Sequence, residues 1–188
     1  MKLIHTMIHP DVDVGAGRVL QRTAVRAIAM EKEDILLLYT KRYDDFSFPG
    51  GGIDQGETLE AGLRRELKEE TGASGIRVLH HYGYLDEYRP HWKPDYDHMF
   101  MRSHFYICTV DRELGETSLE SYEQANGTEP RWINLHEAIQ HNDWLLRRRP
   151  SHMGLSLERE TWMLKKLRDA PVYPSAKPDF NVLELSKT

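Results

Sequence analysis

One 23-residue segment, residues 51–73, constrains this chain more than any other part of its sequence. It reads GGIDQGETLEAGLRRELKEETGA. The glycines at its start are typical of a tight loop, and they predict a helix that begins near Thr58 and stops at Gly72. At about 100° per residue, one face of that helix carries an apolar stripe that should face the core. The stripe consists of Leu59, Leu63 and Leu67.

Three glutamates lie on or beside this stripe, Glu66 and Glu70 within it and Glu69 at its edge. Burying an unpaired anion costs several kcal/mol, and like charges four residues apart add a few tenths of a kcal/mol of repulsion. A divalent cation would remove both penalties. The helix therefore predicts half of a metal site. Clustered oxygen ligands without partner cysteines favour a hard cation, Mg²⁺ or Mn²⁺.

The spacing of these residues resembles the signature of the Nudix (MutT-type) hydrolases. That signature runs Gly, five residues, Glu, seven residues, Arg-Glu, an aliphatic residue, any residue, Glu-Glu, any residue, Gly and an aliphatic residue. Ala73 is smaller than the usual aliphatic residue. The other eight of nine positions match: Gly51, Glu57, Arg65, Glu66, Leu67, Glu69, Glu70 and Gly72.

The resemblance implies an α/β fold, a Nudix-type α/β/α sandwich with a mixed β-sheet. The mixed order of strand and helix patterns along the chain favours the same architecture. Strands are predicted at 22–30, 34–40, 76–85, 99–110 and 131–133, and helices after Leu135 and over 158–168. Residues 86–98, with two prolines, and the polar stretch 111–129 are predicted as loops. We expect an N-terminal extension (1–19), a hydrolase domain (20–150) and a C-terminal helix with an extended tail (151–188).

The chemistry that the resemblance implies is attack of water on a phosphoanhydride, with a nucleoside monophosphate as one product. Glu69 and Glu70 would be metal ligands together with the backbone carbonyl of Gly50. Glu66 would be a third ligand or would orient the attacking water. Arg65 would pair with a loop carboxylate such as that of Glu57. We therefore expect Glu66, Glu69 and Arg65 to be the catalytic residues.

Family members often take a further glutamate from a late loop, as a metal ligand or a general base. Glu129 is the preferred candidate because it precedes Trp132 at a predicted strand entry. The candidates are Glu116, Glu120, Glu123 and Glu129, and each could equally be a solvated loop charge.

Substrate contacts are less constrained by the sequence. Lys41 and Arg42 follow a buried strand and are either phosphate-binding residues or plain surface charges. Loop 86–98 carries rings that form either a base-stacking wall or structural packing. These rings are Tyr88, His91, Trp92 and Tyr96.

Composition limits the partners and the compartment. A net charge of −5 argues against a broad nucleic-acid surface, so we expect a small-molecule nucleotide and no nucleic-acid polymer. No segment approaches the roughly 18 apolar residues of a membrane helix. The single cysteine, Cys108, lies in an apolar strand pattern and is expected to be a buried structural thiol in a reducing, cytoplasmic compartment. The sequence leaves open whether the chain forms a homodimer.

Two other functions remain open. A catalytically inactive Nudix module would bind a nucleotide for regulation, but such a module would be expected to lose carboxylates that this chain retains. An isomerase of the isopentenyl-diphosphate type would need a catalytic cysteine in the pocket, whereas Cys108 lies within a strand.

Overall fold

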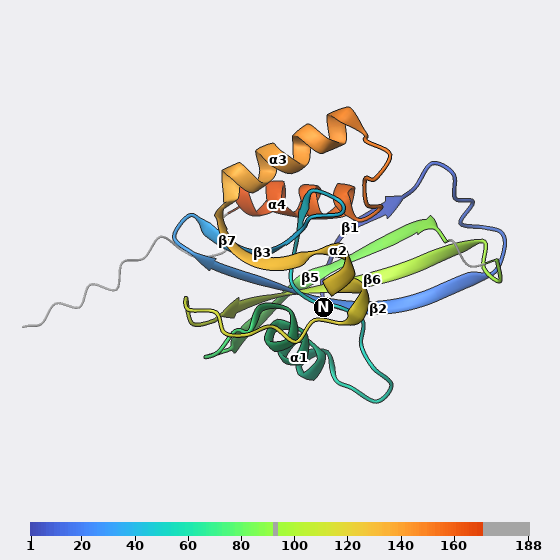
Figure 1. Cartoon of the computed structure of the whole chain (residues 1–188). Helices are drawn as coiled ribbons and strands as arrows, with labels where there is room; N and C mark the ends of the chain where they lie inside the picture. Colours follow the sequence, from blue (N-terminus) through green and yellow to red (C-terminus); the bar gives the residue numbers. More distant parts are fainter. Residues whose placement is uncertain (92–93, 171–188) are drawn as a thin grey trace, which may run out of the picture.

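The computed structural model describes residues 1–91 and 94–170. Figure 1 shows the arrangement of its helices and strands. In chain order these are β1 (Leu3–Ile8), β2 (Val19–Glu31), β3 (Asp34–Thr40), β4 (Asp45–Ser47), α1 (Leu59–Thr71), β5 (Arg77–Pro90), β6 (His98–Thr109), α2 (Ser121–Asn126), β7 (Thr128–Asn134), α3 (Leu135–Arg148) and α4 (Leu157–Asp169).

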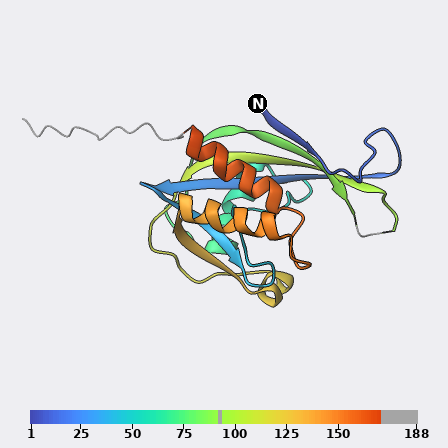
Figure 2. The same ribbon diagram turned by 90° about the horizontal axis from the view of Figure 1, so that it is seen from above.

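The strands form one mixed sheet between helices. Its order is β1-β5-β6-β2-β3-β4, with β7 paired to β3. The β1–β5 and β2–β6 pairs are parallel, and the remaining pairs are antiparallel. Helix α1 lies on one side of the sheet, and α3 and α4 lie next to each other on the opposite side (Figures 1 and 2). The predicted α/β fold with a mixed sheet is confirmed.

The glycine loop that precedes α1 is held by strand-like pairing with β2. Strands β2 and β3 pair only at their shared turn, where Met30 lies opposite Ile35. Beyond that point the loop takes the place of β3. The amides of Ala27 and Val25 donate to the carbonyls of Pro49 and Gly51 at 2.8 and 3.0 Å. Backbone hydrogen bonds therefore hold the loop against β2.

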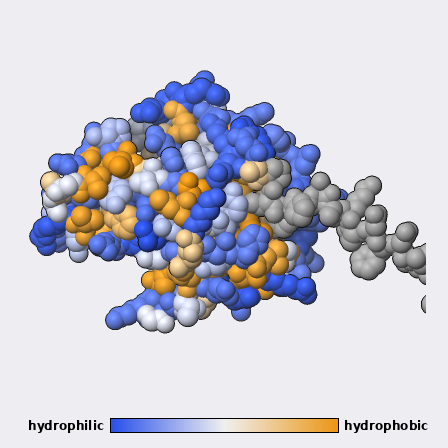
Figure 3. Space-filling view, turned by 180° about the vertical axis from the view of Figure 1, so that it is seen from behind, coloured by the Kyte–Doolittle hydropathy of each residue, from blue (hydrophilic) through white to orange (hydrophobic). Residues whose placement is uncertain are grey.

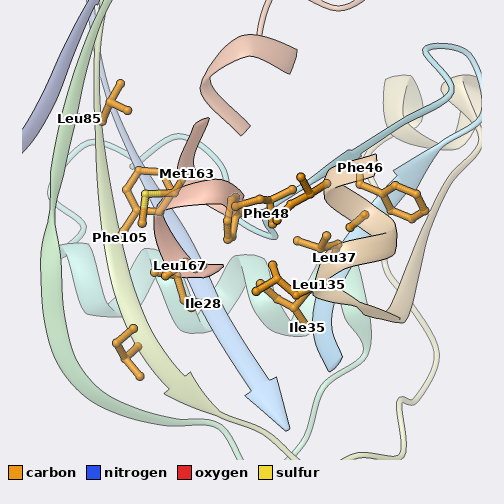
Figure 4. Packing of buried hydrophobic residues seen from close by; sticks show 14 residues of the cluster. Ile28, Ile35, Leu37, Phe46, Phe48, Leu85, Phe105, Leu135, Met163 and Leu167 are labelled. Atoms are coloured by element: carbon orange, nitrogen blue, oxygen red, sulfur yellow. The ribbon is translucent and has the colours of Figure 1, made fainter. Parts of the chain in front are cut away.

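The largest core cluster lies between the sheet and the α3–α4 layer. It contains Ile28, Leu85 and Phe105 from the sheet and Met163 and Leu167 from α4, all buried. Figure 4 shows Phe48 near the middle of these side chains. The Phe48 ring meets that of Phe105 edge-on, with centroids 5.5 Å apart. The residue that enters the glycine loop is thus anchored in the core.

The predicted loop 86–98 is wrong for residues 86–90, which continue β5 in register with β6. The two prolines suggested a loop, but charged residues of this segment have partners far away in the sequence that hold it in the sheet. Arg102 donates to both oxygens of Asp86 at 2.7 and 2.8 Å, and Arg159 donates to Glu87 at 2.7 Å. These pairings offset the cost of placing carboxylates in a strand.

The predicted polar loop 111–129 also contains regular structure, because α2 and the first residues of β7 lie within it. The amide of Glu120 donates to the Glu123 carboxylate at 2.8 Å, and the two residues form a reciprocal capping box. Such a box satisfies amides that the first turn of a helix leaves without partners. It accounts for a helix of only six residues in a polar stretch.

Segments near both ends of the described chain are built into this fold. Strand β1, from the expected N-terminal extension, pairs with β5 from Leu3 to Ile8. Helix α4, from the expected C-terminal segment, buries Leu157, Met163, Leu164 and Leu167. The expected tail lies outside the described residues.

Helix α4 also carries a buried charge network. Arg159 and Glu160 are 2% and 1% exposed. Arg159 donates to Glu160 through Nε at 3.2 Å and to Glu87 of β5 through Nη1 at 2.7 Å. The second oxygen of Glu160 accepts the amide of Phe48 at 3.1 Å. The network therefore links α4, β5 and the start of the glycine loop.

Among the described residues, the helices are too short or too polar to cross a membrane. On the face shown in Figure 3, hydrophobic residues form separate patches among hydrophilic ones.

Candidate active site

Helix α1 begins and ends where the sequence predicts. The Thr58 hydroxyl accepts the Ala61 amide at 3.2 Å, a typical N-cap contact. Gly72 ends the helix in the left-handed conformation, with φ 64°, which glycine adopts without a side-chain clash. Leu63 and Leu67 are fully buried against the sheet. Their packing fixes the rotation of α1 and therefore the direction of its glutamates.

Arg65 joins the helix to the glycine loop. Its Nε and Nη2 atoms donate to the two oxygens of Glu57 at 3.0 Å each, so the predicted ion pair is present. Its Nη1 atom donates to Glu66 at 2.8 Å and to Glu69 at 3.2 Å. The hydrogen bond from Arg65 holds the pKa of Glu57 below its usual range. Arg65 thus orients three glutamates at once.

Glu70 is the most deeply buried carboxylate of the helix, with 5% of its surface exposed. It accepts the Gly50 amide at 2.5 Å. Burial, followed by the nearby charge of Glu66, raises the pKa of Glu70. A β-carbon at Gly50 would lie 2.1 Å from the Val25 carbonyl oxygen, and φ is 131°. Only glycine fits between β2 and Glu70.

Glu66 lies against the next residue of the loop. A β-carbon added to Gly51 would lie 2.6 Å from the Glu66 carboxylate, so the glycine makes room for this side chain. Burial raises the pKa of Glu66, and the contact with Arg65 opposes that shift. Glu69 is less enclosed, with 42% of its side chain exposed. The cluster thus contains one buried, one partly buried and one accessible carboxylate.

Among the late glutamates, Glu123 is the one whose charge acts on Glu70 and contributes to its raised pKa. Loop 111–120, which precedes α2, is held against the end of α1 because the Ser118 amide donates to the Glu69 carbonyl at 2.7 Å. Glu129, the candidate preferred from the sequence, lies in β7 in an ion pair with Arg131. That hydrogen bond is the main cause that lowers the pKa of Glu129. Glu120 caps α2, and Glu116 lies in the loop before it.

The predicted substrate-binding residues lie in different places. Arg42 donates to the side chain of the last residue of α2 at 3.0 Å. The ring of Tyr88 packs on an aromatic ring of β6, with centroids 5.0 Å apart. Trp92 lies outside the described residues. His91 and Tyr96 form a separate ring contact of 6.0 Å.

Cys108 is fully buried in β6. Burial raises the pKa of its thiol to about 12, so the sulfur is protonated at neutral pH. This environment agrees with the structural role predicted from the sequence.

Two charged residues near the glutamates were missed by the sequence analysis. Arg26 interrupts the apolar run of β2, and its charge favours the ionised forms of Glu66 and Glu70. Glu160 holds the Phe48 amide from α4. For Arg26, the sequence did offer a signal, because a charged residue there interrupts an apolar strand pattern. Glu160 is 112 residues from its partner and had no local signal.

The donor set suits a hard cation that keeps part of its water shell. Within residues 1–91 and 94–170, His, Cys, Asp and Glu side chains form no group of three or more that could hold a metal ion unaided. Mg²⁺ commonly uses one or two carboxylates, with water and substrate phosphates completing its shell. Glu66 and Glu70 offer two such carboxylates beside the glycine loop.

The geometry agrees with comparisons to known proteins. The NUDIX domain family model matches residues 20–153. An RNA pyrophosphohydrolase from Caulobacter vibrioides is 51% identical over 35 residues, 19% of this chain and 20% of that protein. An 8-oxo-(d)GTP phosphatase from Mycolicibacterium smegmatis is 42% identical over 43 residues, 23% of this chain and 13% of that protein. These matches span a fifth or less of each relative.

Solved structures share the fold at low identity. A NUDIX hydrolase from Nitrosomonas europaea has a TM-score of 0.53 and 15% identity, covering 78% of this chain and 89% of that one. The E. coli ORF135 protein has a TM-score of 0.51 and 17% identity, covering 82% and 96%. At this identity the likeness concerns the fold alone.

Proposed function

The chain belongs to the Nudix family, and from that premise we propose that it is a divalent-metal-dependent hydrolase of a phosphoanhydride in a small nucleotide. One observation carries the proposal. Glu66 and Glu70 converge on adjacent glycines of a loop that is itself bonded to β2. Two neighbouring carboxylates at this depth favour binding of a divalent cation, and the same cation would let a nucleotide phosphate approach them.

Glu69, Glu70 and the Gly50 carbonyl would hold Mg²⁺ or Mn²⁺, with Glu66 as a further ligand or as the residue that orients water. The ion would neutralise charge on the phosphoanhydride and lower the pKa of a bound water. Arg65 keeps the carboxylates of Glu57, Glu66 and Glu69 in fixed positions. We keep Glu129 as the candidate late glutamate of this site and add Glu123 as a second candidate, because the charge of Glu123 acts on Glu70.

The main alternative is a catalytically inactive module that binds a nucleotide. The intact box speaks for the enzyme, because Arg65 donates to the Gly52 carbonyl and to the glutamates of the loop and the helix. The buried, protonated Cys108 speaks against an isomerase that would need a reactive thiol.

A substrate panel tests the reaction. The names of the partial relatives point to an RNA and to a nucleotide as candidate substrates. We expect Mg²⁺-dependent phosphate release, with pyrophosphatase added, from at least one member of a panel of nucleoside triphosphates and nucleoside diphosphate-linked compounds. A short RNA with a 5′ phosphoanhydride should be a poorer substrate. Binding without turnover across the whole panel would favour the inactive module.

Metal should also stabilise the fold. Mg²⁺ or Mn²⁺ would bind the folded carboxylate cluster and not the unfolded chain, so the melting temperature should rise with metal concentration. At about 100 times the dissociation constant the gain in unfolding free energy is about 2.7 kcal/mol. Thermal melts in millimolar Mg²⁺ and in EDTA measure it, and identical melting temperatures would count against the site. The variant Glu60→Gln, an exposed glutamate of α1, should keep the full response.

A further inference from the structure

The Gly50 carbonyl, which we assign to the cation, lies between two carbonyls that are already engaged. Those of Pro49 and Gly51 accept the amides of Ala27 and Val25 at 2.8 and 3.0 Å. Within residues 1–91 and 94–170, no hydrogen bond reaches the carbonyl of Gly50 itself. Of the three carbonyls, that of Gly50 is therefore the one left available as a metal ligand.

The chain just before this carbonyl is held by α4. The Phe48 amide donates to Glu160 Oε2 at 3.1 Å. The Phe48 ring meets that of Phe105 edge-on, and Figure 4 shows it in the same cluster as Met163 of α4. Phe48 and Glu160 are each 1% exposed. The residue two positions before Gly50 is therefore fixed through both its backbone and its side chain.

Both oxygens of Glu160 have partners, and only a carboxylate satisfies the two together. Oε2 accepts the Phe48 amide, and Oε1 accepts Nε of Arg159 at 3.2 Å. A charged acceptor forms a stronger hydrogen bond than a neutral one. A glutamine has one acceptor oxygen, so its NH₂ group would face either the Phe48 amide or the Arg159 guanidinium, and both of these are donors.

Stability alone is a weak reason to bury this pair. Taking two charges out of water is costly, and apolar residues of similar volume often replace a buried ion pair without loss. The pair does provide a fixed acceptor beside three successive glycines, Gly50 to Gly52. Glycine loses more backbone freedom on ordering than any other residue. An anchor at Phe48 limits the positions open to the Gly50 carbonyl, and a preorganised ligand binds more tightly because less ordering remains for the binding step.

We propose that Glu160 is a positioning residue for the metal site: by holding the Phe48 amide it sets the place of the Gly50 carbonyl, and so the affinity for the divalent cation. The inference rests on the proposed function for the role of Gly50 as a ligand. It adds that this affinity is controlled from α4, which lies on the opposite side of the sheet from the glutamates of α1 (Figures 1 and 2).

Mn²⁺ binding to the full chain without substrate, followed by electron paramagnetic resonance of the free ion, tests the proposal apart from turnover. Glu160→Gln should weaken Mn²⁺ binding by at least about tenfold, because one of the two contacts of the carboxylate is lost. Its kcat at saturating Mn²⁺ should fall much less, because the glutamates of α1 are unchanged. An effect on metal affinity with little effect on kcat is the signature of positioning.

The matched control is Leu167→Ala, about two turns further along α4. Leu167 is 1% exposed and belongs to the same core cluster as Phe48, so its truncation should also lower the melting temperature. The contact between Phe48 and Glu160 stays in place. Leu167→Ala should therefore bind Mn²⁺ as the unmodified chain does, which separates positioning from a general weakening of α4.

Amide exchange on the unmodified chain gives a second test that does not depend on the folding of any variant. With ¹⁵N-labelled phenylalanine and EDTA present, the Phe48 amide should exchange slowly with solvent. It is buried and bonded to Glu160 before a cation binds.

Three results would overturn the proposal: Mn²⁺ binding by Glu160→Gln as tight as that of the unmodified chain, an equal loss of affinity in Leu167→Ala, or rapid exchange of the Phe48 amide in EDTA. The substrate panel reports on the reaction separately. Weakened Mn²⁺ binding by Glu160→Gln, with no turnover of any compound by the unmodified chain, would support the positioning role and reject the hydrolase. Turnover by the unmodified chain, with unaltered Mn²⁺ binding in Glu160→Gln, would do the reverse.

Discussion

Arg159→Met is expected to lower the free energy of unfolding by about 3–5 kcal/mol, the loss typical of a broken buried ion pair. The substitution keeps an apolar stem and leaves the carboxylates of Glu87 and Glu160 buried without their shared cation. Since domains are stable by only about 5–15 kcal/mol, the variant would lose a large part of its stability. Urea denaturation followed by circular dichroism measures the change.

The matched control is Arg168→Met on the same helix. Arg168 forms an exposed pair with Asp169 at 2.7 Å, so its substitution should leave the stability nearly unchanged. A loss below about 1 kcal/mol for Arg159→Met would show that the network contributes little, as some buried ion pairs do.

Glu70→Gln should reduce kcat by about a hundredfold or more, equivalent to about 2.7 kcal/mol of transition-state stabilisation. The amide keeps the shape of the side chain and can still accept the Gly50 amide. It removes a negative charge from the proposed cation site. Steady-state turnover of the best panel substrate at saturating Mg²⁺ measures the effect.

The stability of Glu70→Gln should not fall as its turnover does. Burial and the charge of Glu66 both disfavour ionised Glu70, so a neutral side chain should leave the melting temperature in EDTA unchanged or higher. Glu60→Gln on the first turn of α1 should affect neither property. Near-normal turnover by Glu70→Gln would remove Glu70 from the catalytic site.

The site could be predicted from the sequence wherever its contacts are local. Thr58, Gly72 and the pair between Arg65 and Glu57 all lie within one loop and one helix. Turn chemistry and helical periodicity describe such a segment well. The leucine stripe then fixed which glutamates would be buried, and Glu70 is the buried one.

Features that depend on distant partners could not be predicted. Residues 86–90 were predicted as a loop from the nearby prolines, and the partners that hold Asp86 and Glu87 in the sheet lie 16 and 72 residues away. Glu129 was preferred for its place at a strand entry, but Arg131 on the same strand pairs with it. The action of the Glu123 charge on Glu70 depends on how loop 111–120 packs on the end of α1. The contacts of Asp86, Glu87 and loop 111–120 lie outside any short sequence window, whereas the pair between Glu129 and Arg131 is local and was missed.

The hydrogen bond between Phe48 and Glu160 joins residues 112 positions apart, and this has a consequence for how the protein folds. Contacts of high sequence separation close late, because the entropy of loop closure must be overcome first. During synthesis the glycine loop would leave the ribosome long before the helix that holds it. Until α4 is complete, the core around Phe48 stays open on one side. We therefore expect the glycine loop to be among the last parts of this protein to become rigid.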